Sequence, residues 1–112
     1  GCPMRVCQGV RTVAQQQALY AKGRTAPGRI VTYCDGVLKK SNHQPKGDGL
    51  GHAVDCCFQG KNPFLETPAD PDAVWKWAAY GACVEVVGLR WGGRFKSLVD
   101  KPHAELPLKP SV

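Results

Sequence analysis

No stretch of this sequence approaches about 18 consecutive apolar residues, the length that a membrane-spanning helix needs, so we expect no membrane insertion. No signal peptide is visible, and the chain begins with Gly1 rather than methionine, so we expect a processed or shortened N-terminus. Internal repeats and low-complexity tracts are also missing. With 112 residues, 43% of them hydrophobic and 21% charged, the chain is expected to form one globular domain over residues 1–112.

Acidic residues are scarce: nine acidic residues face fifteen basic ones, which gives a net charge of +6. A positive chain favours anionic partners such as nucleic acid, membrane surfaces or cell-wall polymers. The basic residues are scattered, however, and the short patches "VLKK" and "GGRFK" lack interleaved aromatic residues or a helix-turn-helix pattern. We therefore expect no nucleic-acid partner.

No Cys-x-x-Cys pair is present, although the chain has six cysteines: Cys2, Cys7, Cys34, Cys56, Cys57 and Cys83. Cysteines inside apolar runs usually behave as small buried hydrophobic residues, so we expect most of them to be reduced. A disulfide between Cys2 and Cys7 or between Cys7 and Cys34 remains an alternative. Another alternative is that the chain is a secreted binding protein that is stabilised by disulfides.

Two helices are predicted from their boundary residues. Thr12 and Gln15 have the spacing of a capping box, and Gly23 lies where a glycine ends a helix. The second helix is expected to have Asp70 as its N-cap and to end at Gly88.

Short strands are expected between and after these helices, at residues 1–9, 30–34, 52–58, 89–95 and 103–106. The helices bracket the strands without a regular βαβ alternation. The sequence therefore predicts an α+β fold in which an antiparallel sheet is flanked by two main helices.

The segment "SNHQPKGDGLGHAVD" contains two histidines and an aspartate that follows an apolar pattern. Side chains alternate along a strand, so Asp55 shares a face with Ala53, while His52 points to the other side. A carboxylate inside an apolar strand must be paired or must bind a cation. We interpret His52 as structural, and His43 as a loop residue that can fold back toward Asp55.

The segment "DKPHAEL" places Asp100 and His103 three residues apart around a proline. With His43 and Asp55, His103 would complete two imidazoles and one carboxylate, the ligand set of a catalytic zinc site with an open position. Asp100 would then remain as a general base. In the competing interpretation, each histidine is an ordinary structural residue. Glu105 is expected to support His103 or to form an ion pair.

Four ordered segments resemble motifs of the zinc peptidases that cleave peptidoglycan stem peptides, namely D,D-carboxypeptidases and the L-alanyl-D-glutamate endopeptidases used as phage endolysins. The four are "GVRTVAQQQALYAKGRT", "SNHQ…GHAVD", "GLRWGGRF" and "DKPHAEL". The resemblance implies a D,D-peptidase/hedgehog-like fold. It also implies roles for six residues: the zinc ligands His43, Asp55 and His103, the catalytic base Asp100, Arg11 on a substrate carboxylate or oxyanion, and the supporting Ser41.

The sequence departs from the family pattern at four places. The loop "QPKGDGL" is longer than usual, Ala104 replaces a common aromatic residue, and the segment that usually precedes the first strand is missing. Cys57 shares the face of Asp55 and could compete as a zinc ligand.

From the resemblance we expect a zinc-dependent L-alanyl-D-glutamate endopeptidase of phage or prophage origin, an antimicrobial endolysin. It would be a monomer, made in the host cytoplasm and released at lysis to act on the cell wall. The alternatives are a D,D-carboxypeptidase that removes terminal D-Ala and a non-catalytic module that binds zinc or cell wall on the same fold.

Overall fold

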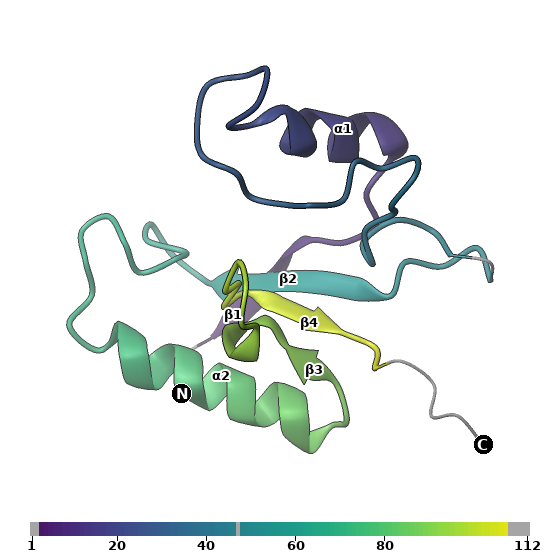
Figure 1. Ribbon diagram of the computed structural model, residues 1–112. Coiled ribbons are helices and arrows are strands. Elements are labelled where there is room, and N and C mark those ends of the chain that lie inside the picture. The colour runs from purple at the N-terminus through teal and green to yellow at the C-terminus, as the bar shows by residue number, and fades with distance from the viewer. Residues whose placement is uncertain (1–2, 47, 108–112) are drawn as a thin grey trace. The chain divides into compact units, whose positions relative to one another are not determined.

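Backbone pairing joins four strands that lie far apart in the sequence into one antiparallel sheet (Figure 1). The sheet has the order β1-β2-β4-β3. Its strands are β1 (Met4–Gln8), β2 (Ala53–Phe58), β3 (Arg90–Trp91) and β4 (His103–Glu105). Four of the five predicted strands and the α+β class are therefore confirmed.

The computed structural model describes residues 3–46 and 48–107, and these fall into two compact units. The sheet unit contains the described residues of 1–8 and 54–112, and the α1 unit contains those of 9–53. The prediction that residues 1–112 act as one domain stays a prediction.

The pairing of β1 with β2 contains a β-bulge next to Asp55. Arg5 pairs with Cys57 and Gln8 with Asp55, and the register shifts between Val6 and Gln8. Cys7 is therefore the extra residue of the bulge. Bulges bend a strand and redirect its side chains, and they are common beside functional sites.

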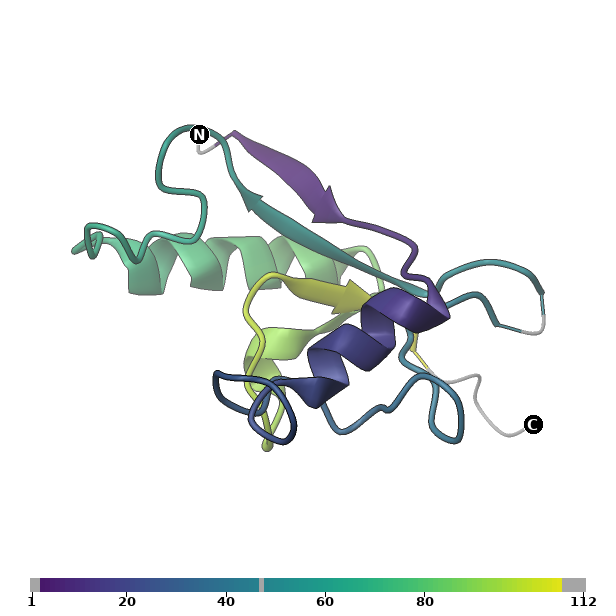
Figure 2. The same ribbon diagram turned by 90° about the horizontal axis from the view of Figure 1, so that it is seen from above.

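The core of the sheet unit lies under helix α2 (Ala73–Val86), which packs against β3 (Figure 2). Phe58, Leu65 and Trp77 are buried there, and the rings of Phe58 and Trp77 meet edge to face at 4.8 Å. Gly81 allows Trp91 to pack on the helix, since a Cβ at position 81 would lie 2.3 Å from the indole. None of the helices described is long and apolar enough to cross a membrane.

The start of α2 differs from the prediction, because its N-cap is Asp72 and not Asp70. The Asp70 carboxylate instead accepts a hydrogen bond from Asp72 N at 2.8 Å and binds Lys76 Nζ at 2.7 Å. The Asp70 side chain thus closes a turn by binding the backbone of Asp72, and the helix begins two residues later than predicted. The predicted end at Gly88 is confirmed, with the left-handed φ of 88° that glycine tolerates best.

Helix α1 (Val13–Ala21) has the predicted capping box. Gln15 N donates to Thr12 Oγ1 at 3.1 Å, and Thr12 N donates to Gln15 Oε1 at 2.9 Å. Gly23 follows the helix with φ 76°, as expected of a C-terminal glycine.

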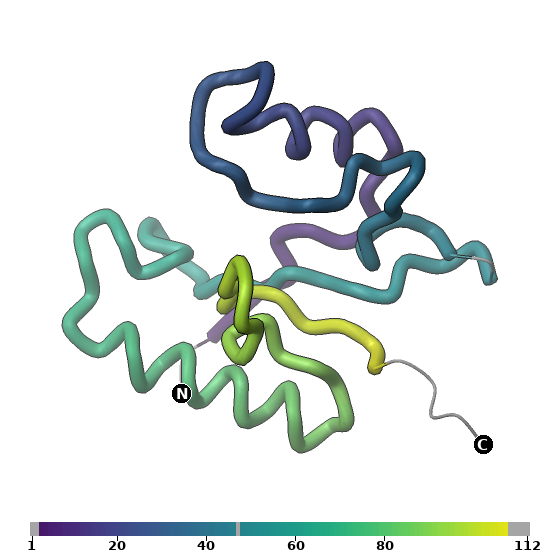
Figure 3. The backbone as a smooth tube through the Cα atoms, viewed as in Figure 1, coloured from purple at the N-terminus to yellow at the C-terminus, as the bar shows by residue number. Residues whose placement is uncertain are grey.

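The strand predicted at residues 30–34 is wrong, and this segment belongs to a long loop after α1 (Figure 3). Gln16 Nε2 donates to Thr32 Oγ1 at 3.2 Å and to Cys34 O at 2.9 Å. Cys34 N also donates to Thr32 Oγ1. These side-chain bonds occupy groups that a strand would use for ladder pairing, in spite of the β-branched composition.

The five described cysteines, Cys7, Cys34, Cys56, Cys57 and Cys83, are all free thiols. The Cys7–Cys34 alternative is therefore wrong, and the expectation of mostly reduced cysteines is confirmed for these five. Cys2, and with it a Cys2–Cys7 bridge, lies outside the described residues.

Replacing Thr12 by alanine removes one hydrogen bond of the capping box. We expect the free energy of unfolding, measured with urea, to fall by about 1 kcal/mol. Gln17→Ala, an exposed change in the same helix, is the control and should change it by less than half as much. Equal effects of the two variants would show that the cap contributes nothing.

Candidate active site

Asp100 and His103 lie on a tight turn that leads into β4. His103 N donates to Asp100 O at 3.1 Å, and Asp100 N donates to Gly92 O at 3.0 Å, at the start of the short helix η1 (Gly92–Arg94). A Cβ at position 92 would lie 2.1 Å from Asp100 O and 2.7 Å from His103 Cβ. Only glycine at position 92 lets the turn close against η1.

Two aromatic side chains hold the carbonyl groups between Asp100 and His103. Trp91 Nε1 donates to Lys101 O at 2.7 Å, and Tyr80 OH donates to Pro102 O at 2.8 Å. Burial above all, and then the thiol of Cys56, raise the pKa of Tyr80, so its hydroxyl stays protonated as a donor. Sequence reasoning missed both roles, because the spacing of Trp91 and Tyr80 is also that of ordinary core residues.

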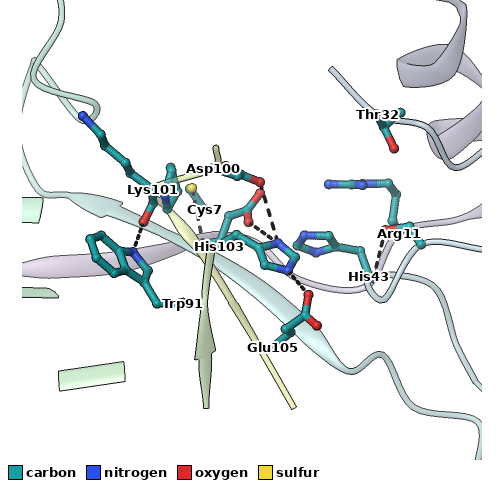
Figure 4. A network of polar contacts seen from close by, with 12 residues as sticks. Cys7, Arg11, Thr32, His43, Trp91, Asp100, Lys101, His103 and Glu105 are labelled. Carbon is teal, nitrogen blue, oxygen red and sulfur yellow. Dashed lines mark hydrogen bonds and ion pairs between the residues drawn. The ribbon is translucent and has the colours of Figure 1, made fainter. Parts of the chain in front are cut away.

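The His103 ring faces carboxylates at both nitrogens (Figure 4). Its Nε2 lies 2.7 Å from Glu105 Oε1, while its Nδ1 lies 3.4 Å from Asp55 Oδ1 and 3.7 Å from Asp100 Oδ2. An ionised carboxylate only accepts hydrogen bonds, so Nε2 carries a proton. In the neutral ring, the lone pair is then on Nδ1, facing Asp55 and Asp100.

These carboxylates set the charge of the site. Burial lowers the pKa of His103, but hydrogen bonds to Asp55 and Glu105 and the charge of Asp100 outweigh it, so the pKa lies above its usual value of 6.5. A lone pair that faces two carboxylates is repelled unless a cation lies between them. A proton on Nδ1 or a metal ion meets this need, and imidazole with carboxylate suits a transition metal such as zinc.

Asp55 reaches the site from β2, beside the bulge of β1. Cys7 Sγ donates to Asp55 O at 3.4 Å. Burial, followed by hydrogen bonding with Cys57, raises the pKa of Cys7 to about 11, so this thiol is protonated at neutral pH and a poor metal ligand. Cys57 is fully buried and engaged with Cys7. Competition by Cys57 as a ligand stays a prediction.

In the α1 unit, His43 is buried and held by its own loop. Its Nδ1 lies 3.2 Å from Gly9 O, and because a carbonyl only accepts, Nδ1 is the protonated nitrogen. The lone pair is then on Nε2, the nitrogen that can bind a metal. His43 N donates to Ser41 Oγ at 3.2 Å, and Arg11 N donates to His43 O at 2.7 Å.

Two buried glutamines that sequence reasoning missed organise this unit. Arg11 Nη1 donates to Oε1 of the fully buried Gln16 at 2.7 Å. Gln44 Oε1 accepts from Ser41 N at 2.9 Å, and its Nε2 donates to Gly36 O at 3.0 Å. Nothing in the runs "QQQ" and "SNHQ" marks which glutamine is buried.

His52 contacts a surface carboxylate, with Nε2 2.7 Å from Asp48 Oδ2. This agrees with its interpretation as a structural residue. The six predicted site residues form two groups. Asp55, Asp100 and His103 lie together in the sheet unit, and Arg11, Ser41 and His43 lie in the α1 unit.

Imidazole and carboxylate donors are typical ligands of the metal in metal-dependent hydrolases. The chain belongs to the M15 peptidase family: residues 36–106, more than half of the sequence, match a profile of this family described as D-alanyl-D-alanine carboxypeptidase. The M15 peptidases are metallopeptidases. Of the six predicted site residues, the match includes Ser41, His43, Asp55, Asp100 and His103.

A curated relative is the peptidoglycan L-alanyl-D-glutamate endopeptidase CwlK of Bacillus subtilis (strain 168), which is 29% identical over 110 residues. The match covers 95% of this chain but only 62% of CwlK, so the chain spans less than two thirds of that relative. The crystal structure of the Serratia marcescens L-Ala D-Glu endopeptidase ChiX has a TM-score of 0.50 and 22% identity, over 95% of this chain and 68% of ChiX. This likeness supports the fold.

Gly92→Ala tests the turn that carries Asp100 and His103. The added methyl group would overlap Asp100 O, so we expect the free energy of unfolding to fall by about 1–3 kcal/mol, measured by urea titration. Gly9→Ala is the matched control, since a Cβ there meets no atom within 4 Å. If Gly92→Ala were as stable as the control, the turn would not need glycine.

Proposed function

We propose that this chain is the catalytic part of a zinc-dependent peptidoglycan hydrolase that cleaves the stem peptide between L-Ala and D-Glu. The observation that carries the proposal is the buried His103 imidazole, whose Nδ1 faces the carboxylates of Asp55 and Asp100. The choice of substrate is supported by the similarity to CwlK over nearly the whole of this chain.

The proposed zinc ligands are His43, Asp55 and His103. His103 Nδ1 and Asp55 Oδ1 lie together in the sheet unit, and His43 offers the lone pair on Nε2. Zinc bound there would lower the pKa of a water molecule to about 7 and so supply the nucleophile.

Asp100 is the proposed general base. Its side chain is 46% exposed, so it can reach a water molecule, and its Oδ2 lies 3.7 Å from His103 Nδ1. Asp100 takes the proton of the attacking water and returns it to the leaving amine as the peptide bond breaks. The turn that packs against Gly92 keeps Asp100 beside the proposed ligand His103, although Asp100 itself is not a proposed ligand.

Arg11 is proposed to stabilise negative charge on the substrate, and Ser41 to support His43. Gln16 fixes the buried Arg11 guanidinium, which can bind a stem-peptide carboxylate or the developing oxyanion. Ser41 Oγ accepts the backbone hydrogen bond of His43 and so shapes the loop that carries the ligand.

A second candidate activity is D,D-carboxypeptidase, the description carried by the family profile that residues 36–106 match. The same ligands and base would serve it, since both reactions hydrolyse a peptide bond. The positive net charge suits either enzyme on an anionic wall. Phage or prophage origin, antimicrobial endolysin action, release at lysis and a monomeric state stay predictions.

Digestion of purified muropeptides, followed by mass spectrometry, tests the proposed reaction. We expect products cut between L-Ala and D-Glu, and we expect a chelator to abolish them and zinc to restore them. Loss of a single terminal Ala would identify a D,D-carboxypeptidase instead. Undiminished cleavage in chelator would refute the metal mechanism.

The Asp100→Asn variant tests whether Asp100 acts in catalysis rather than in zinc binding. We expect kcat to fall by about 100- to 10,000-fold, because general-base catalysis is lost, while the zinc content stays at one ion per chain. The control is Asp72→Asn, an exposed carboxylate of the same unit that makes no side-chain cap bond. Wild-type turnover in Asp100→Asn would remove Asp100 from the mechanism.

A further inference from the structure

We propose that Arg90 and Glu105 act as a positioning pair that fixes the ring of His103, so that Nδ1 and not Nε2 binds the metal. The inference rests on the proposed metal site, and it assigns a function to two residues that are neither ligands nor base. It concerns the sheet unit alone.

The pair follows from the register of the last two strands. Arg90 on β3 stands directly opposite Glu105 on β4, and Arg90 Nη1 lies 3.2 Å from Glu105 Oε2. Glu105 and His103 are two residues apart on β4, so their side chains share a face. Glu105 therefore uses one carboxylate oxygen for Arg90 and the other for His103 Nε2.

Burial makes these two contacts necessary. The Glu105 side chain is only 8% exposed, and a buried carboxylate needs compensating donors. The His103 Nε2 proton and the Arg90 guanidinium supply them. Because Arg90 holds one oxygen of Glu105, the other oxygen stays directed at His103 Nε2, and the opposite nitrogen, Nδ1, stays directed at Asp55 and Asp100.

Arg90 also reaches the His103 ring by a second route. Its guanidinium lies 5.5 Å from the centre of the Phe95 ring, and Phe95 in turn lies 5.4 Å from the His103 ring at an interplanar angle of 57°. One arginine thus contacts both neighbours of the imidazole. Glu105 binds Nε2, and Phe95 packs beside the ring and limits its rotation.

Rotation of the ring by a half turn would break the bond between Nε2 and Glu105 and turn carbon atoms toward Asp55. The pair of Arg90 and Glu105 therefore excludes the rotated ring before any metal arrives. This preorganisation should appear in metal affinity and in the identity of the bound nitrogen, not only in turnover.

The test uses Glu105→Gln, Arg90→Gln and Arg90→Lys. The exposed pair Glu85 and Arg94 lies in the same unit, and Glu85→Gln and Arg94→Gln are the matched controls. Zinc affinity is measured by competition with a chromophoric chelator. In cadmium-loaded protein with labelled histidine nitrogens, NMR coupling to the metal identifies the bound nitrogen of His103.

We expect cadmium coupling to His103 Nδ1 in the wild type. Glu105→Gln should weaken zinc binding by about 10- to 100-fold. Arg90→Gln should weaken it less, and Arg90→Lys, which keeps the charge, should recover part of that loss. Neither control should change affinity. A merely structural role would lower the melting temperature without moving the affinity of the folded variants.

Three results would overturn the inference: cadmium coupling to His103 Nε2, wild-type zinc affinity in Glu105→Gln, or equal losses in the controls. If Glu105→Gln does not fold, the two variants of the half-exposed Arg90 decide between the outcomes, and wild-type zinc affinity in Arg90→Gln would then overturn the inference. Failure of the proposed function looks different, since the wild type would then bind zinc without cleaving muropeptides, or bind no zinc at all.

Discussion

One imidazole among three carboxylates is the interaction on which this structure depends. His103 contacts Glu105 through Nε2 and both Asp55 and Asp100 through Nδ1. Such an arrangement is stable only if positive charge is supplied on both sides of the ring. On one side the Nε2 proton and Arg90 supply it, and on the other a proton or a metal ion must do so. This charge balance favours either a protonated ring or a bound cation, and so it supports the proposed metal site.

The sheet order brings these groups together from distant parts of the chain. Because β4 lies next to β2, residues 55 and 103 become neighbours, and Cys56 N donates to Pro102 O between them at 3.0 Å. The turn before β4 is irregular, but its backbone is fixed by contacts with other elements. Trp91 and Tyr80 bind its carbonyl groups, and Gly92 allows it to pack closely against η1. The proposed base, Asp100, is therefore held in a defined position although it lies on a turn.

Features that depend on residue type and local spacing could be predicted from the sequence, whereas features that depend on tertiary contacts could not. An aspartate in an apolar strand and the D-x-x-H spacing are unusual enough to be recognised, and the capping box of α1 is local. The expected strand at residues 30–34 failed because the buried Gln16, sixteen residues away from Thr32, takes up its polar groups. Arg90 could not be found either, since its position opposite Glu105 exists only in the paired sheet.

The acidic residues are distributed so that the site is locally negative although the protein as a whole is positively charged. Three of the nine acidic side chains converge on His103, although the net charge of the chain is +6. A local negative cluster attracts a metal cation, while the positive remainder favours approach to an anionic polymer. Metal binding would neutralise the cluster and remove its repulsion toward an anionic substrate. The same ion that completes the charge balance of His103 would thus also let an anionic ligand approach the site.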